Sequence, residues 1–115
     1  MDVDCIAFTG STRTGKQIMQ YAGQSNLKRA WMELGGKSPN IVCADTADID
    51  AAVEASVGSI FFNQGESCNA PSRLLVEASI KDQFIERAMK LVPQYAPADP
   101  LDPNTVMGAL VDEVQ

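Results

Sequence analysis

Histidine is absent from this 115-residue sequence, and basic residues, aromatic residues and long hydrophobic runs are all scarce. Without histidine, no cysteine or serine of the chain has an imidazole base, so an active thiol needs a carboxylate, a helix terminus or groups outside the chain. No apolar run approaches the roughly 20 residues that span a bilayer, and the N terminus lacks the basic flank and cleavage site of a signal peptide. We therefore expect a cytoplasmic protein without a membrane segment.

Positive charge is also in short supply. Nine Lys and Arg residues oppose fifteen Asp and Glu residues, which gives a net charge of −6. The basic residues are scattered, so no patch is available to neutralise a nucleic-acid backbone, and nucleic acid is not an expected partner. Cys5, Cys43 and Cys68 are odd in number and widely separated, which fits neither a disulfide framework nor a zinc site with paired ligands. We expect no bound metal.

The remaining composition is that of a folded globular protein, with 45% hydrophobic residues and a mean hydropathy of −0.08. Short apolar runs alternate with segments of helical periodicity, which predicts an α/β fold. The expected strands cover residues 5–8, 28–34, 40–44 and 72–77. One expected helix follows the loop at residues 9–15, and two more cover residues 48–62 and 79–92. The prolines between residues 93 and 103 predict an irregular connection.

Helix caps and core positions follow from the side chains. Thr46 or Asp48 is the expected N-cap of the second helix, and Ser79 with Asp82 has the spacing of a capping box for the third. The residues expected to fill the core are Cys5, Trp31, Cys43, Phe61, Phe62, Leu74, Leu75 and Val76, with the helical stripe Phe84, Ile85, Ala88, Met89 and Val92.

Gly35 and Gly36 mark the expected boundary between two parts of the chain. The first strand begins almost at Met1, without the flanking strands that a parallel sheet requires, and the last element is cut short. The sequence is therefore expected to be an internal piece of a longer protein.

The loop TGSTRTG, between an expected strand and an expected helix, is a candidate phosphate site. Such a loop presents backbone N–H groups and the positive end of the helix dipole to an anion. Gly10 allows close approach of the backbone, and Ser11 and Thr12 add hydroxyl donors. The loop lacks the G-x-G-x-x-G spacing, and plain helix capping is the alternative interpretation.

Two further residues are candidates for chemistry. Glu33 ends a strand before two glycines, where a carboxylate can face a cleft; a solvated side chain, or one paired with Lys37, is the alternative. Cys68 follows Gly65 and is expected at the start of a short turn or helix, where the local dipole favours thiolate and its own N–H can face an oxyanion. An inert, buried cysteine is the alternative.

Taken in order, FTGSTRTG, ELGGKSPNIV and FFNQGESCNAPSRLLVE form a combination that resembles the NAD(P)-dependent aldehyde dehydrogenase superfamily. The resemblance covers essentially the whole chain, because DPLDPNTVMGALV is also similar to a family segment, with Ala109 where a proline is usual. The nearest similarity is to enzymes that act on γ-glutamylamino-butyraldehyde and other amino aldehydes.

The resemblance implies a fold and a reaction. Residues 1–35 are expected to be the end of a Rossmann-like cofactor domain, and residues 36–115 the start of an α/β catalytic domain. Cys68 is expected to attack the aldehyde and give a thiohemiacetal, whose hydride passes to NAD or NADP and leaves a thioester. Glu33 is expected to activate the water that hydrolyses this thioester, so that no metal is required.

The resemblance also implies a cofactor site. Gly10 and Ser11 are expected against the pyrophosphate, Thr12 and Gly15 complete the turn, and Leu34 lies beside the nicotinamide. The full-length protein is expected to be a homo-oligomer. The chain alone is expected to be inactive, since the residues that read the ribose and the asparagine of the oxyanion hole lie elsewhere.

One departure and several alternatives stay open. Glu66 stands where the family usually has glutamine; an ionised carboxylate close to the thiol would oppose its activation, whereas a carboxylate that points away would not. The alternatives are an acylating or non-phosphorylating relative, a pseudoenzyme that binds cofactor without turnover, and a binding or structural protein in which Cys68 is inert.

Overall fold

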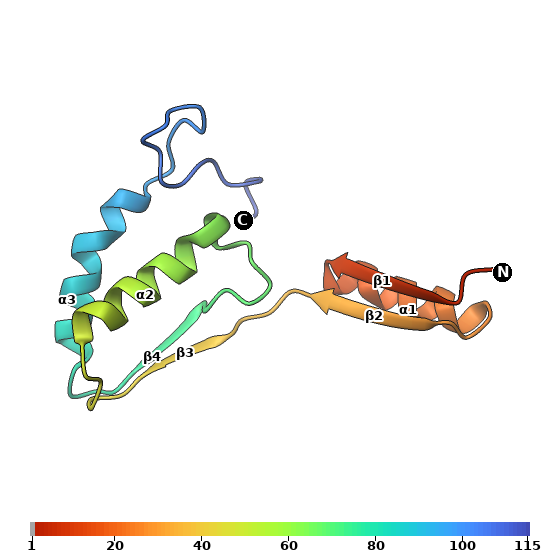
Figure 1. Ribbon diagram of the computed structural model, residues 1–115, viewed down its shortest axis with the longest axis horizontal. Helices are drawn as coiled ribbons and strands as arrows, with labels where there is room; N and C mark the ends of the chain where they lie inside the picture. The colour runs from red at the N-terminus through yellow and green to blue at the C-terminus, as the bar shows by residue number, and fades with distance from the viewer. Residues whose placement is uncertain (1) are drawn as a thin grey trace. The chain divides into compact units, whose positions relative to one another are not determined.

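The computed structural model describes residues 2–115, in which helices and parallel strands alternate as the α/β prediction requires. The chain divides into two compact units, Met1–Gly36 and Lys37–Gln115. Each unit contains one pair of parallel strands with helical cover (Figure 1).

The first unit is a strand, a helix and a second strand. Strand β1 (Cys5–Gly10) pairs in parallel with β2 (Arg29–Leu34), in a register that runs from Cys5 opposite Arg29 to Gly10 opposite Leu34. Helix α1 (Thr12–Gln24) makes the crossover that a parallel pair requires. Both strands therefore end at the same edge of the sheet, where α1 begins.

Helix α1 starts at Ser11 for a local chemical reason. The Ser11 hydroxyl accepts a hydrogen bond from the N–H of Thr14 at 3.2 Å, and its carbonyl accepts the N–H of Gly15 at 2.9 Å. A serine in this position satisfies N–H groups that have no partner within the helix. The expected strand, loop and helix over this segment are confirmed.

The second unit has two helices on one face of its sheet. Strand β3 (Pro39–Val42) pairs in parallel with β4 (Arg73–Val76), and helices α2 (Ile49–Phe61) and α3 (Lys81–Leu91) lie side by side over them (Figure 1). Two 3-10 turns, η1 (Phe62–Gly65) and η2 (Val92–Tyr95), extend the helices. Its core contains Val42, Val53, Val57 and Phe84, of which Val53 and Phe84 are 1% and 0% exposed.

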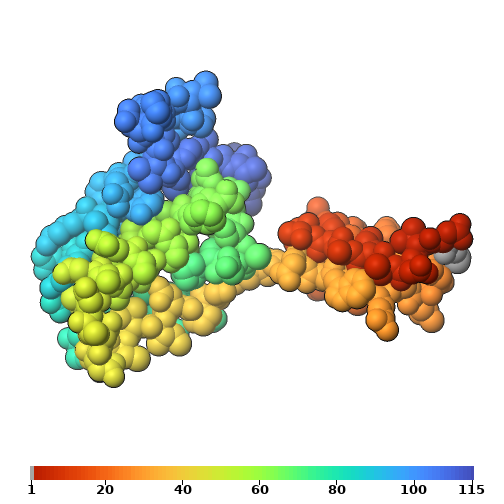
Figure 2. All heavy atoms as spheres, in the orientation of Figure 1, coloured from red at the N-terminus to blue at the C-terminus, as the bar shows by residue number. Residues whose placement is uncertain are grey.

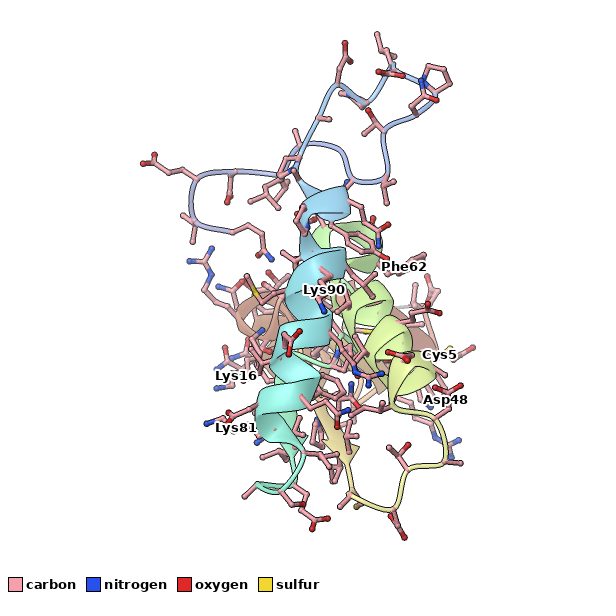
Figure 3. All side chains as sticks on the ribbon, turned by 90° about the vertical axis from the view of Figure 1, so that its left-hand side faces the viewer. Cys5, Lys16, Asp48, Phe62, Lys81 and Lys90 are labelled. Atoms are coloured by element: carbon pink, nitrogen blue, oxygen red, sulfur yellow. The ribbon has the colours of Figure 1, made fainter. Side chains whose placement is uncertain are left out.

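Of the two helix caps predicted in this unit, one is confirmed and one is wrong. Asp48 begins α2, because its carboxylate accepts the N–H of Ala51 at 3.0 Å; Figure 3 shows Asp48 at the start of the helix and Phe62 at its end. The predicted capping box of Ser79 and Asp82 is wrong. Helix α3 begins after Ile80 without a side-chain cap, and the Ser79 hydroxyl donates to Glu77 instead.

Several residues predicted to be buried are exposed. All three cysteines are exposed, so the placement of Cys5 and Cys43 in the core is wrong. The same correction applies to Trp31, Phe62, Leu74, Leu75, Ile85 and Met89. For the strand residues the reason is geometric: alternate residues of a strand point to opposite faces, and in the described residues each two-stranded sheet has helices on one face only. Phe62 follows α2, and Ile85 and Met89 lie on the exposed side of α3.

Candidate active site

Cys68 lies in a tight turn between η1 and β4. The N–H of Ala70 donates to the carbonyl of Ser67 at 3.0 Å, which closes the turn around Cys68, and the cysteine is exposed. Of the two alternatives for this segment, the turn is therefore the one observed. No helix within residues 2–115 begins at Cys68, so the helix dipole that we expected to favour its thiolate is not present in this segment.

The backbone just before Cys68 is unusual. Asn63, Gln64 and Gly65 have consecutive positive φ values of 48°, 58° and 75°. A left-handed conformation costs roughly 1–2 kcal/mol for each residue with a Cβ, whereas glycine adopts it freely. This left-handed turn, residues 63–65, makes up most of η1, ends the helical run of α2 and sends the chain toward Cys68.

Sequence reasoning anticipated the break at Gly65 but missed the conformation of the two residues before it. The local signal is weak, because asparagine and glycine are the residues that most often adopt the left-handed region, while glutamine seldom does. A residue such as Gln64 takes this conformation only where its surroundings hold it there.

Glu33 lies near the carboxyl edge of the first unit's sheet. It is the fifth of the six residues of β2, pairs in register with Thr9, and is exposed. A carboxylate at this edge has a lone pair available for a proton.

The five residues that the sequence assigned to the cofactor gather at this same edge. Gly10 and Leu34 are register partners at the ends of β1 and β2, and Ser11 and Thr12 follow directly. Gly15 lies in the first turns of α1, where an added Cβ would be 2.8 Å from Leu34 Cδ2. In open parallel sheets, ligands bind outside the carboxyl ends of the strands.

Ser11 and Gly15 already have structural roles at this edge. The Ser11 hydroxyl donates to Thr14 Oγ1 at 2.9 Å while it caps α1, and Gly15 is buried against Leu34 inside the helix rather than in the turn before it. The N–H groups of Thr12 and Arg13, in the first turn, have no acceptor within the helix. They are the donors left for an anion.

Two structural features are absent from residues 2–115. No helix in this range is long and apolar enough to cross a membrane. The same range contains no group of three histidine, cysteine or acidic side chains that could hold a metal ion.

Comparisons with known proteins agree with these features. Residues 1–115 match the model of the aldehyde dehydrogenase family. The chain is 53% identical over 111 residues to the NADP/NAD-dependent aldehyde dehydrogenase PuuC of Escherichia coli. The aligned residues make up 96% of this chain and 22% of that protein.

Solved structures give the same result. A gamma-glutamyl-gamma-aminobutyraldehyde dehydrogenase from Burkholderia cenocepacia is 62% identical, with a TM-score of 0.93 over 98% of this chain and 23% of that chain. An indole-3-acetaldehyde dehydrogenase in complex with NAD⁺ is 56% identical, with a TM-score of 0.94 over 99% of this chain and 23% of that chain. The chain thus spans between a fifth and a quarter of these relatives, and it belongs to the aldehyde dehydrogenase family.

Proposed function

We propose that the whole protein oxidises an aldehyde to a carboxylic acid with NAD or NADP, and that this chain supplies the nucleophile Cys68 and the general base Glu33. The observation that carries the proposal is the family match over residues 1–115, joined to relatives named as NAD(P)-dependent aldehyde dehydrogenases. An exposed thiol in a tight turn and an exposed carboxylate at a sheet edge are consistent with these two roles.

The residues at the carboxyl edge of β1 and β2 fit a dinucleotide. The N–H groups of Thr12 and Arg13 and the N terminus of α1 can receive a pyrophosphate, and Gly10 carries no side chain to block it. The close packing of Gly15 against Leu34 fixes the start of α1 over this edge. When bound, NAD or NADP accepts the hydride; the protein binds and orients it.

In the proposed reaction, the Cys68 thiolate adds to the carbonyl carbon of the aldehyde and forms a carbon–sulfur bond, so that the carbonyl oxygen becomes an oxyanion. Backbone N–H groups of the turn can donate to this oxyanion. The oxyanion collapses to a carbonyl as the hydride leaves for the cofactor, which oxidises the carbon and leaves an acyl thioester on Cys68.

Glu33 is proposed to act in the second half of the reaction. Its carboxylate takes a proton from water while the water oxygen adds to the thioester carbon, and the carbon–sulfur bond then breaks to release the acid and the Cys68 thiolate. An enzyme that passes its acyl group to coenzyme A does not need this base. The presence of a glutamate at position 33 therefore favours hydrolysis over acyl transfer.

Several finer statements belong to the same proposal. The name of one structural relative, a gamma-glutamyl-gamma-aminobutyraldehyde dehydrogenase, supports amino aldehydes as the substrate class. We assign residues 1–35 to a cofactor domain and residues 36–115 to a catalytic domain, and we propose that Glu33 and Cys68 converge on one substrate. A cytoplasmic location and a homo-oligomeric assembly also stay predictions.

Burst kinetics of the full-length protein that contains this chain test the two roles separately. Cys68→Ser should abolish the first NADH turnover, because no thioester forms, while Cys5→Ser and Cys43→Ser are matched controls that should retain it. Glu33→Gln should still release about one NADH for each site and then stall. Turnover by Cys68→Ser, or steady turnover by Glu33→Gln, would contradict the respective assignment.

Alkylation distinguishes the enzyme from a protein with an inert thiol. Because all three cysteines are exposed in this structure, access alone does not rank them. Iodoacetamide near pH 7 should label Cys68 first, since the thiolate is the reactive form. Equal rates at the three cysteines would support an inert Cys68, and cofactor binding without product from any aldehyde would support a pseudoenzyme.

A further inference from the structure

The chain segment Val106–Val111 lies against the left-handed turn at residues 63–65. Figure 2 shows the C-terminal residues, in blue and violet, packed on the green residues that follow α2. Met107 is only 7% exposed, and with Val106 it lines a hollow of about 500 Å³ whose other walls include Phe62, Asn63 and Gln64. Residues more than 40 positions apart in the sequence thus share the walls of one hollow beside the strained turn.

A second contact is made at the neighbouring glycine. An added Cβ on Gly108 would lie 3.5 Å from Gln64 Nε2 and 3.6 Å from Pro100 Cβ, which places the backbone of this segment next to the Gln64 side chain. The N–H of Ala98 donates to the carbonyl of Met107 at 3.0 Å and holds the segment to the irregular connection before it. Residues 106–108 are therefore fixed on both sides.

Glu66 supplies the polar link. Its carboxylate oxygen Oε1 accepts the backbone N–H of Val111 at 3.2 Å, across 45 positions of sequence. The backbone N–H of Glu66 donates to the carbonyl of Asn63 at 3.0 Å, which closes the left-handed turn. Glu66 thus joins the turn to the Val106–Val111 segment and lies two positions before Cys68.

We propose that Glu66 is a positioning residue: by bonding Val111 it holds residues 106–111 against the left-handed turn and thereby fixes the turn that carries Cys68. Two consecutive left-handed residues with side chains persist only where the surroundings over-determine them, and these contacts provide the surroundings. The proposal rests on the role proposed above for Cys68. It assigns the carboxylate to the backbone of Val111 and not to the thiol.

Two substitutions separate this role from an effect of charge on the thiol. Glu66→Gln keeps an oxygen that can accept the Val111 N–H but removes the charge, whereas Glu66→Ala removes both. In the full-length protein, hydrogen–deuterium exchange of a peptide covering residues 106–112 should be about fivefold faster in Glu66→Ala, the size expected from loss of one net hydrogen bond. In Glu66→Gln it should stay within about twofold of the parent.

The reactivity of Cys68 distinguishes a positioning role from a merely structural one, because a merely structural bond would not change it. The rate of the NADH burst should fall by about fivefold in Glu66→Ala and be largely retained in Glu66→Gln. The midpoint of the pH profile of Cys68 alkylation should be the same in the parent and in Glu66→Gln. Glu113→Ala removes an exposed carboxylate from the same end of the chain and should alter none of these measurements.

Removing the donor instead of the acceptor provides an independent check. Val111→Pro deletes the N–H that Glu66 accepts and leaves Glu66 intact. It should reduce the burst rate as Glu66→Ala does, and the double variant should be no slower than either single variant, because both remove the same bond. The burst rate of Val111→Pro alone, compared with the parent, keeps the proposal testable if Glu66→Ala fails to fold.

Three results would overturn the proposal. A pH profile in Glu66→Gln that moves to lower pH would show that the carboxylate acts on the thiol through its charge. Unchanged exchange of residues 106–112 in Glu66→Ala would show that the bond does not hold the segment. Additive losses in the double variant would show that the two residues act separately. Failure of the proposed function would be seen differently, as turnover by Cys68→Ser. That result would not alter the hydrogen–deuterium exchange of residues 106–112 in the Glu66 variants.

Discussion

Replacement of Gly15 by alanine tests whether the cofactor edge depends on close packing between α1 and β2. An ideal Cβ at this position would lie 2.8 Å from Leu34 Cδ2, 3.2 Å from Cδ1 and 3.6 Å from Cγ, so the isobutyl group of Leu34 has to move as a whole. Gly23 is a matched control in the same helix, because an added Cβ there has no neighbour within 4 Å.

The control isolates the steric contribution. Alanine is more favourable than glycine in a helix by about 0.8–1 kcal/mol, and this gain applies to both positions. Overpacking of a filled site costs about 1–3 kcal/mol and applies only to Gly15. The two variants should therefore differ by about 1–3 kcal/mol, with Gly15→Ala close to neutral or destabilised and Gly23→Ala stabilised by up to about 1 kcal/mol.

Hydrogen–deuterium exchange over α1 in the full-length protein measures this difference, because exchange reports the free energy of local opening. Residues of α1 should exchange about five- to hundredfold faster in Gly15→Ala than in Gly23→Ala. The affinity for NAD should fall in Gly15→Ala only, since a displaced α1 moves the Thr12 and Arg13 N–H groups. Equal protection of α1 in the two variants would refute the close approach of Gly15 and Leu34.

Two further predictions concern the second unit. Phe84→Ala should destabilise it by about 3–5 kcal/mol, as for other buried phenylalanines, whereas Ile85→Ala on the exposed side of α3 should cost far less, since Phe84 is 0% and Ile85 44% exposed; equal urea midpoints for the two variants would contradict this core. The hydrogen bond and positive charge of Lys90 lower the pKa of Glu86, so Glu86→Gln should slightly weaken the unit at pH 7 and lose its effect as the pH falls through the lowered value; a greater loss in acid would contradict this sign.

The sequence predicted the elements of this structure well where one local signal sufficed. Ser11 and Asp48 are N-caps because each places a side-chain oxygen on an N–H three residues ahead, and both lie before a helical period. The capping box predicted at Ser79 does not form, because this side chain makes a different bond. The Ser79 hydroxyl donates to Glu77, whose carboxylate also accepts the N–H of Ala44, so the spacing of a capping box was present without its bond.

Burial was predicted less well, because it depends on what covers a face and not on the residue alone. Ile41 and Leu75 are opposite each other in the parallel register and are 66% and 52% exposed, while Val42, the next residue along β3, is 6% exposed. An apolar run predicts a strand, but it does not say which alternate residues a helix will cover. Cys43 follows Val42 and is exposed by the same alternation.

The candidate site shows the limit of local reasoning most clearly at Cys68. The motif around it and the resemblance that it carries suffice to nominate the thiol, and the family match supports that nomination. Neither indicates that Glu66 reaches Val111, because a hydrogen bond across 45 positions has no periodic or compositional signal. A turn with two left-handed residues costs roughly 2–4 kcal/mol in isolation, which is more than one exposed hydrogen bond returns. The close approach of the Gly108 backbone to the Gln64 side chain, next to the buried Met107, contributes to the difference, so the geometry of the proposed nucleophile depends on residues that no local motif identifies.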